Sequence, residues 1–276
     1  QLHETISIYD RSGIFCEFED KFAAYHDMPH GLLSNSGTSA IFSMLEGIAL
    51  RPGDEVLCPS YTFHATISPI LYTGATPVFC DALPDGNIDP AEIEHKITGR
   101  TKAVIVTHMW GMPCAMGSIA EICSKHGIYL LEDCSHAHGA SSENRKVGSW
   151  GDAAAWSLQG QKIISGGEGG ILLTKHMDIL TRALLQGHYN KRCKQQIEPG
   201  HPLARFALTG FGLKLRAHPL AIAIANQQFK MLDTWIAQKH AFAERYTAAF
   251  ARYPFLVLPE FSRRQPSWYA YVMLFD

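Results

Sequence analysis

Residues 157–170 read Ser-Leu-Gln-Gly-Gln-Lys-Ile-Ile-Ser-Gly-Gly-Glu-Gly-Gly, with a single lysine, Lys162, ahead of a glycine-rich turn. Apolar runs at 153–158 and 171–174 flank this segment and are predicted to be strands. The glycines at 166, 167, 169 and 170 accept backbone conformations closed to other residues, so the turn can hold the lysine inward. An amine held in this way can form a Schiff base with an aldehyde. Taken alone, the pattern also fits a solvated hairpin lysine, so its interpretation depends on the rest of the chain.

Strand and helix patterns alternate along the first two thirds of the chain. The predicted strands lie at 31–34, 55–59, 76–80, 103–108, 128–132, 153–158 and 171–174. Most are separated by segments with helical spacing, and such strands are buried on both faces. The sequence therefore predicts an α/β fold with a seven-stranded, mostly parallel sheet flanked by helices. The last two strands are joined without a helix, which is consistent with one antiparallel neighbour.

The remaining third is mostly helical. We expect helices at 179–185, 217–235 and 239–250, followed by strands at 254–258 and 269–275. This pattern divides the chain into a large domain, residues 1–215, and the start of a smaller C-terminal domain, residues 216–276. Because the sequence ends just past its last strand, we expect the second domain to be incomplete.

Composition excludes several classes of protein. The chain has 276 residues, 46% of them apolar, and a formal net charge of −2. This charge gives no reason to expect nucleic acid or an anionic membrane as a partner. No apolar run approaches the roughly 20 residues that span a bilayer.

The cysteines and histidines do not form a recognisable metal or disulfide pattern. There are seven cysteines, an odd number, and no pair has Cys-x-x-Cys spacing. They are predicted to be buried thiols of a protein in a reducing cytoplasm. His136 and His138 are two residues apart and would share a strand face, but no third ligand is evident. We therefore expect no metal.

Polar residues cluster where predicted strands end, which is where ligands bind in open sheets of this kind. Gly37, Thr38 and Ser39 open a helix after a strand and offer free amides and hydroxyls to a phosphate. Asp133 follows an apolar run, and a buried carboxylate needs a charged or hydrogen-bonded partner. With Lys162, these are the groups that pyridoxal phosphate requires. Singly, they could be a helix cap, a turn residue and a surface lysine; together they favour a cofactor site.

Six motifs strengthen this interpretation: Asn35-Ser36-Gly37-Thr38-Ser39-Ala40, Pro52-Gly53-Asp54-Glu55-Val56, Pro59-Ser60-Tyr61-Thr62-Phe63-His64-Ala65-Thr66, Gly74-Ala75-Thr76-Pro77-Val78, Glu132-Asp133-Cys134-Ser135-His136-Ala137-His138-Gly139-Ala140 and Gly167-Glu168-Gly169-Gly170. With the segments between them they cover about residues 15–230. On these motifs the sequence resembles the DegT/DnrJ/EryC1/StrS family of aminotransferases that use pyridoxal 5'-phosphate. The resemblance implies fold type I, with the cofactor bound in residues 1–215.

The resemblance also implies roles for individual residues. Lys162 would be the aldimine lysine and proton shuttle, and Asp133 would pair with the pyridine nitrogen. Gly37, Thr38 and Ser157 would contact the phosphate. Phe63 and His136 would contact the cofactor ring. Phe63 would stack on it, which suits a flat apolar side chain, and His136 would lie near its hydroxyl group.

The activity implied by the resemblance is transfer of an amino group from glutamate or glutamine to a keto sugar, nucleotide-linked, or to a cyclitol-type ketone. The resemblance further implies a homodimer, and the cysteines indicate that it is cytoplasmic. Two alternatives stay open. A sugar dehydratase of the same family would carry histidine in place of Lys162, and a regulatory relative without turnover would not need Lys162 and Asp133. The sequence does not distinguish between the possible acceptors or donors.

Two features depart from the family pattern. Gly212 lies where the family often has an asparagine that reaches the neighbouring subunit's phosphate, so we expect Lys214 or Arg216 to supply that contact. The family also extends beyond this sequence at both ends, so substrate residues outside it are not visible.

The polar stretch 187–192 is a separate candidate. It is either another contribution to the neighbouring site or a solvated loop.

Overall fold

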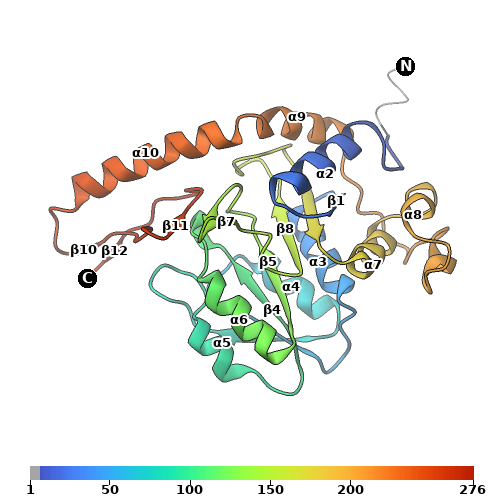
Figure 1. Ribbon diagram of the computed structural model, residues 1–276, viewed down its shortest axis with the longest axis horizontal. Coiled ribbons are helices and arrows are strands. Elements are labelled where there is room, and N and C mark those ends of the chain that lie inside the picture. Colours follow the sequence, from blue (N-terminus) through green and yellow to red (C-terminus); the bar gives the residue numbers. More distant parts are fainter. Residues whose placement is uncertain (1–6) are drawn as a thin grey trace.

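A seven-stranded sheet forms the centre of the protein, in a computed structural model that describes residues 7–276 (Figure 1). Its order is β1-β9-β8-β5-β4-β2-β3. The strands are β1 (His30–Ser34), β2 (Glu55–Pro59), β3 (Thr76–Cys80), β4 (Thr101–Thr107), β5 (Tyr129–Asp133), β8 (Ala153–Ser157) and β9 (Gly170–Thr174). Strand β9 is antiparallel to both β1 and β8, and the other pairings are parallel. The predicted seven-stranded, mostly parallel sheet is therefore confirmed.

Helices cover both faces of the sheet. They are α2 (Gly13–Tyr25), α3 (Gly37–Gly47), α4 (His64–Tyr72), α5 (Pro90–Lys96), α6 (Met116–His126) and α7 (Met177–Gly187). Successive residues of a strand point to opposite faces, and Leu32 and Leu33 of β1 accordingly belong to different cores. Leu32 packs with residues of α3 and α7, whereas Leu33 packs with the phenylalanines of α2. A third core lies under α5 and α6. Burial on both faces explains why the strands lack polar alternation.

The C-terminal part departs from the predicted element boundaries. Helices α9 (Pro219–Phe229) and α10 (Leu232–Phe250) meet at residues 230–231, not near residue 237. Lys230 and Met231 keep nearly helical dihedral angles, so the break is a local bend that no glycine or proline marks. Figure 1 shows α10 extending past the sheet towards β10 (Leu256–Val257) and β12 (Leu274–Phe275). Among residues 7–276, no helix is both long and apolar enough to cross a membrane.

The predicted strands at 254–258 and 269–275 shrink to the two-residue strands β10 and β12. Residues 267–270 instead follow the loop after β4, where their amides meet carbonyl groups of that loop. A small sheet joins β11 (Arg264–Gln265) to β6 (Ser141–Ser142) and β7 (Arg145–Lys146). The C-terminal segment is thus tied to the large sheet domain, and the proposed division at residue 215 stays a prediction.

The cysteines are free thiols throughout the described residues, as predicted. All except Cys16 are buried. Burial raises the pKa of Cys58 and of Cys123 to about 12, so neither thiol is a nucleophile near neutral pH.

Buried histidines should make the stability depend on pH. Burial lowers the pKa of His26 to about 4 and those of His138 and His188 to about 3. An imidazole in the unfolded chain titrates near 6.5, so on acidification the unfolded state takes up protons first. We expect the contribution of these three histidines to the free energy of unfolding to be constant above about pH 7 and to fall as the pH decreases from about 6.5 towards their folded pKa values of about 3 to 4. Each buried imidazole contributes a slope of about 1.4 kcal/mol per pH unit.

Urea unfolding measured across this pH range checks the expectation. His26 packs against Phe22 and Trp156, so His26→Phe retains an aromatic ring of similar shape. We expect this variant to reduce the slope by about 1.4 kcal/mol per pH unit. His126→Gln, which removes an exposed imidazole, is the matched control. An unchanged slope in His26→Phe would contradict the assignment.

Candidate active site

A cavity of about 600 Å³ opens at the carboxyl ends of β4, β5 and β8. Thr107, Asp133 and Ser157, the last residues of these three strands, line it. The structure brings every predicted site residue to this cavity: Gly37, Thr38, Phe63, Asp133, His136, Ser157 and Lys162. The sequence-based prediction of one site at the strand ends therefore agrees with the geometry, while the role of each residue stays a prediction.

The N-terminus of α3 forms one wall of the cavity. Ser36 is the N-cap, and its hydroxyl accepts a hydrogen bond of 3.1 Å from the amide of Ser39. The first amides of a helix have no partner within it, and the helix dipole favours an anion there. Gly37 allows α3 to approach β8, because a Cβ at this position would lie 2.6 Å from the Cβ of Ser157. The wall therefore offers amides and hydroxyls to an anionic group.

Phe63 stands at the entrance of the cavity. It is the N-cap residue of α4, and 60% of its surface is exposed. Its ring lies 4.1 Å from that of His64, measured between centroids. The ring is thus free of the apolar core and available to stack on a planar ligand.

Asp133 is buried at the end of β5 with only 4% of its surface exposed. One carboxylate oxygen accepts a hydrogen bond of 2.6 Å from the hydroxyl of Thr66, and the other accepts one of 3.0 Å from the amide of Ser135. Among the ion pairs within residues 7–276, none includes Asp133. Burying a carboxylate is costly without a compensating charge, so the site favours a ligand with a cationic or proton-bearing nitrogen.

Lys162 lies between β8 and β9, and its side chain is partly buried. Burial lowers the pKa of its amine, and the nearby Asp133 carboxylate partly opposes this. The glycines act in two ways. Gly167 and Gly169 have left-handed φ values of 87° and 145°, as the sequence predicted. Gly166 is instead required by close packing, since a Cβ there would lie 2.4 Å from the carbonyl oxygen of Ala221 in α9.

His136 lies in the turn after β5 and lines the same cavity as Lys162. Its ring stacks on Tyr269 at 4.0 Å and 8°, and more loosely on Trp110 at 5.9 Å. Burial, with a smaller contribution from the Lys162 charge, lowers the pKa of His136 to about 4. The imidazole is therefore neutral near pH 7, and its buried Nδ1 has no hydrogen-bond partner among the described residues. The expectation that His136 and His138 share a strand face was wrong, because both follow β5 in turns.

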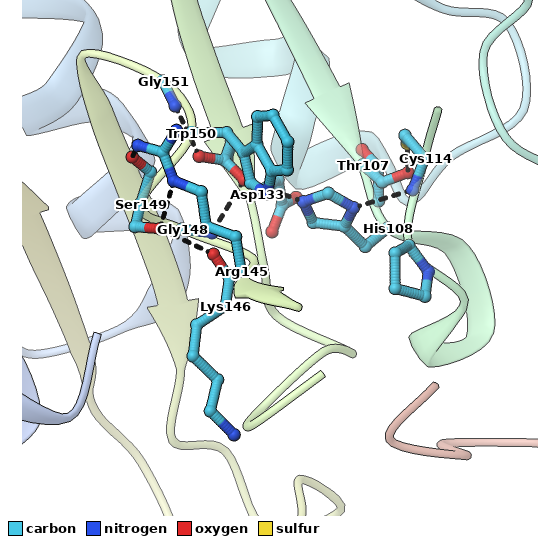
Figure 2. Close-up of polar contacts among 12 residues, drawn as sticks. Thr107, His108, Cys114, Asp133, Arg145, Lys146, Gly148, Ser149, Trp150 and Gly151 are labelled. Carbon is cyan, nitrogen blue, oxygen red and sulfur yellow. Dashed lines mark hydrogen bonds and ion pairs between the residues drawn. The ribbon is translucent and has the colours of Figure 1, made fainter. Parts of the chain in front are cut away.

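A buried network fixes the end of β5 on which Asp133 sits. The Glu132 carboxylate accepts hydrogen bonds of 2.7 Å from the amides of Gly148 and Gly151. It also accepts one of 3.1 Å from His108 Nε2, and His108 Nδ1 accepts one from the Cys114 amide (Figure 2). This pattern requires a neutral imidazole with its proton on Nε2.

Cys134 joins His108 and Glu132 in a trio whose ligand atoms lie within 4.8 Å. The hydrogen bonds already occupy both imidazole nitrogens and both carboxylate oxygens. These contacts indicate that the trio supports β5 and the loop 145–151 rather than binding a ligand. Arg145 stiffens the same loop by donating to the hydroxyl and carbonyl oxygens of Ser149 (Figure 2).

Several cavity residues were missed by sequence reasoning, among them Tyr61, Trp110, Gln159, Gln161 and Tyr269. Trp110 lies three residues after the end of β4, so its position just past a strand end was a usable signal. Tyr269 carried none, because it lies 107 residues beyond Lys162 in a segment that was predicted to be a strand.

The stretch 187–192 is not a solvated loop throughout. His188 and Arg192 are buried, and Arg192 donates hydrogen bonds of 2.9 and 2.8 Å to the two carboxylate oxygens of Glu19. Residues from Lys191 onwards form helix α8 (Lys191–Gln196). Arg192 is thereby committed to its own chain, although Tyr189 remains partly exposed.

Gly212 is exposed and adopts a left-handed φ of 94°. Asparagine tolerates left-handed conformations better than most residues do, so either residue suits this turn. The carbonyl oxygen of Leu215 accepts a hydrogen bond of 2.7 Å from the amide of Asn35, just before α3. Lys214 is exposed, while the Arg216 guanidinium lies 5.5 Å from the Tyr189 ring centroid.

Comparison with known proteins gives concordant matches. A family model, the DegT/DnrJ/EryC1/StrS aminotransferase family, matches residues 11–276. The chain is 34% identical over 263 residues to the spore coat polysaccharide biosynthesis protein SpsC of Bacillus subtilis (strain 168), covering 94% of this chain and 68% of SpsC. It is 36% identical over 238 residues to the GDP-perosamine synthase of Caulobacter vibrioides, covering 86% of this chain and 62% of the synthase.

A solved structure, S. venezuelae DesV in complex with a ketimine intermediate, matches with a TM-score of 0.86 and 30% identity. The match covers 98% of this chain and 70% of DesV. The chain thus spans roughly two thirds of the length of the proteins it matches.

Proposed function

This chain belongs to the DegT/DnrJ/EryC1/StrS aminotransferase family, and we propose that it binds pyridoxal 5'-phosphate and transfers an amino group from glutamate or glutamine to a keto sugar. The observation that carries the proposal is the cavity itself. It combines the Lys162 amine, the buried Asp133 carboxylate and the N-terminus of α3. These are the three groups that this cofactor needs from a protein.

The cavity residues fit the cofactor in three separate ways. The buried Asp133 carboxylate forms no ion pair within residues 7–276 and would hold a proton on a ring nitrogen. The unpartnered Nδ1 of His136 would meet a ring hydroxyl group. The amides of Gly37 and Thr38, with the Ser157 hydroxyl, would bind the phosphate. Phe63 would cover one face of the ring.

The chain's own residues would then move a single proton. When bound, the cofactor supplies an electron sink that acidifies the carbon bearing the amino group. Lys162 Nζ would take the proton from that carbon and deliver it to a carbon of the cofactor. Burial lowers the pKa of this amine and so favours its neutral form. A base requires the neutral form. The neutral His136 adds no second positive charge to the site.

We propose a keto sugar, nucleotide-linked, as the amino acceptor, with a cyclitol-type ketone as the second class. The names of the relatives support a sugar, since one is a GDP-perosamine synthase and another a polysaccharide biosynthesis protein. Lys162 argues against the dehydratase alternative, in which histidine would replace it. The Lys162 and Asp133 pair argues against a regulatory relative without turnover.

The activity can be tested in two stages. The chain loaded with pyridoxal 5'-phosphate should lose its visible absorbance when glutamate or glutamine is added, because the amino group moves to the cofactor. Keto sugar nucleotides and cyclitol ketones, offered with ¹⁵N-labelled donor, should then take up the label and restore the absorbance. Unchanged absorbance with both donors would count against the transaminase.

We further propose that the protein is a homodimer with shared sites. Exposed apolar side chains support an interface, in particular Leu71, Tyr72, Phe79, Leu208 and Phe211. These side chains would be covered by a second copy. Lys214 is exposed and is the leading candidate for the contact to the partner's phosphate, with Arg216 second.

Mixing two inactive variants tests this arrangement. Lys162→Ala and Lys214→Ala chains, combined in equal amounts, should form heterodimers in which one of two sites carries neither lesion. Random exchange should then restore about a quarter of the native activity. A mixture that stays inactive after confirmed subunit exchange would exclude Lys214, and sedimentation as a monomer would exclude the dimer.

A further inference from the structure

Tyr269 is the one cavity residue from the C-terminal segment, and several contacts hold it there. The Ser267 hydroxyl donates a hydrogen bond of 2.8 Å to the carbonyl oxygen of His136, and the Ser267 amide donates one of 3.0 Å to that of Gly111. The Ala270 amide donates to the carbonyl oxygen of Trp110 at 3.2 Å. Lys239 of α10 donates to the carbonyl oxygen of Trp268 at 2.8 Å. The segment 267–270 is thus fixed against the cavity wall.

Gly111 makes this docking possible. Its φ is 84°, and a Cβ there would lie 2.5 Å from the Ser267 hydroxyl and 2.9 Å from both the His136 carbonyl oxygen and the Tyr269 amide. Any larger residue would push the segment 267–270 away from the turn that carries His136. The glycine therefore determines whether Tyr269 reaches the cavity.

The Tyr269 ring contacts both functional groups on this side of the site. It stacks on His136 at 4.0 Å, and the Lys162 ammonium nitrogen lies 4.9 Å from its centroid. This distance is within the range of a cation–π interaction, which favours the charged form of the amine. Within the described residues the Tyr269 hydroxyl has no hydrogen-bond partner, so the ring rather than the hydroxyl makes the contacts.

We propose that Tyr269 is a positioning residue whose ring stabilises the protonated Lys162 amine, and that this contact exists only while the segment 267–270 is docked. The proposal rests on the role proposed above for Lys162. It assigns Tyr269 the opposite effect to burial: burial favours the neutral amine, and the aromatic ring limits that bias. The C-terminal segment would thereby adjust the base at the centre of the site.

Other ionisable groups near Lys162 also affect the pKa of its amine, and their effects must be separated from that of Tyr269. Asp133 at the end of β5 favours the ammonium form. His136 and His138, in the turns after β5, have lowered pKa values of about 4 and about 3 and are neutral near the titration of an amine. Glu168 lines the same cavity from the turn before β9. A substitution at Tyr269 replaces none of these groups, although it removes the ring that stacks on His136.

The test is the pKa of the Lys162 amine in the cofactor-free chain. Fluorodinitrobenzene labelling from pH 6 to 11, with the Lys162 peptide quantified by mass spectrometry, gives this value directly. We expect Tyr269→Leu to lower the pKa by about 0.5 to 1, since it retains apolar bulk but loses the aromatic face. Tyr269→Phe should match the native chain. Gly111→Ala, which displaces the segment, should lower the pKa as Tyr269→Leu does.

Tyr271→Leu is the matched control, because Tyr271 directly follows the segment 267–270 but packs on Trp268 and bonds to Thr247. If Tyr271→Leu lowers the pKa of Lys162 by the same amount, Tyr269 acts only through general packing and the proposal is wrong. An unchanged or raised pKa in Tyr269→Leu would overturn the proposal. No donor or acceptor is present in this assay, so its outcome is independent of whether the chain proves to be a transaminase.

Discussion

Lys162→Ala should reduce turnover by about 10² to 10⁴-fold or more, the usual contribution of a positioned acid–base group. The substitution removes the amine that would carry the proton, while the fold around it is kept by glycines and by β8 and β9. The phosphate contacts proposed for Gly37, Thr38 and Ser157, which line the same cavity, would not involve Lys162. We therefore expect weaker but measurable binding of pyridoxal 5'-phosphate. A fluorescence titration would measure this binding.

Two controls make this result specific. Lys175→Ala removes a lysine just beyond the far end of β9, outside the cavity, and should leave turnover close to native. Added methylamine should partly restore turnover to Lys162→Ala, because a small amine fits the vacated space and can move the same proton. Near-native turnover in Lys162→Ala would refute the assignment of the base.

Asp133→Asn should slow proton removal by about 10²-fold while preserving the fold. A hydrogen bond to a charged group is worth about 1.5–3 kcal/mol, and a neutral amide would hold a ring proton much less firmly. The neighbours can adapt, because Thr66 contacts the hydroxyls of Thr62 and Thr107 and can reverse its hydrogen bond to accept from the new amide. Single-turnover kinetics with the amino donor would measure the effect.

Thr66→Val is the matched control for Asp133→Asn, since it removes the hydrogen bond of 2.6 Å but leaves the carboxylate charge. We expect it to lose far less activity than Asp133→Asn. The Asp133 charge also raises the pKa of Lys162, so Asp133→Asn should lower that pKa further. Equal single-turnover rates in Asp133→Asn and the native chain would show that the carboxylate does not hold the ring proton.

The sheet and the cavity were predictable because both depend on local patterns. Strands buried on both faces leave continuous apolar runs, and strands such as β2 and β3 have the predicted bounds. Asp133, Ser157 and Lys162 follow such runs, so their meeting at one edge of the sheet follows from parallel pairing. The family motifs then supplied the chemistry that the patterns alone left open.

What could not be predicted depends on contacts between distant segments. Tyr269 reaches the cavity only because residues 267–270 bond to the loop after β4, and no periodicity encodes that pairing. The bend at residues 230–231 has no glycine or proline to mark it. Arg192 looks like a surface cation in the sequence, yet it is buried against Glu19, which lies 173 residues earlier.

The position of β9 in the sheet has a consequence for how the chain folds during synthesis. Among the strands of residues 7–276, β1 pairs only with β9, at residues 170–174. A ribosome that has made β1 and α3 must therefore still translate β2, β3, β4, β5 and β8 before β1 has a strand to join. Until then its edge is unpaired, and such edges promote aggregation. We expect nascent chains stalled before residue 170 to need a chaperone, and chains released after β9 to need it much less.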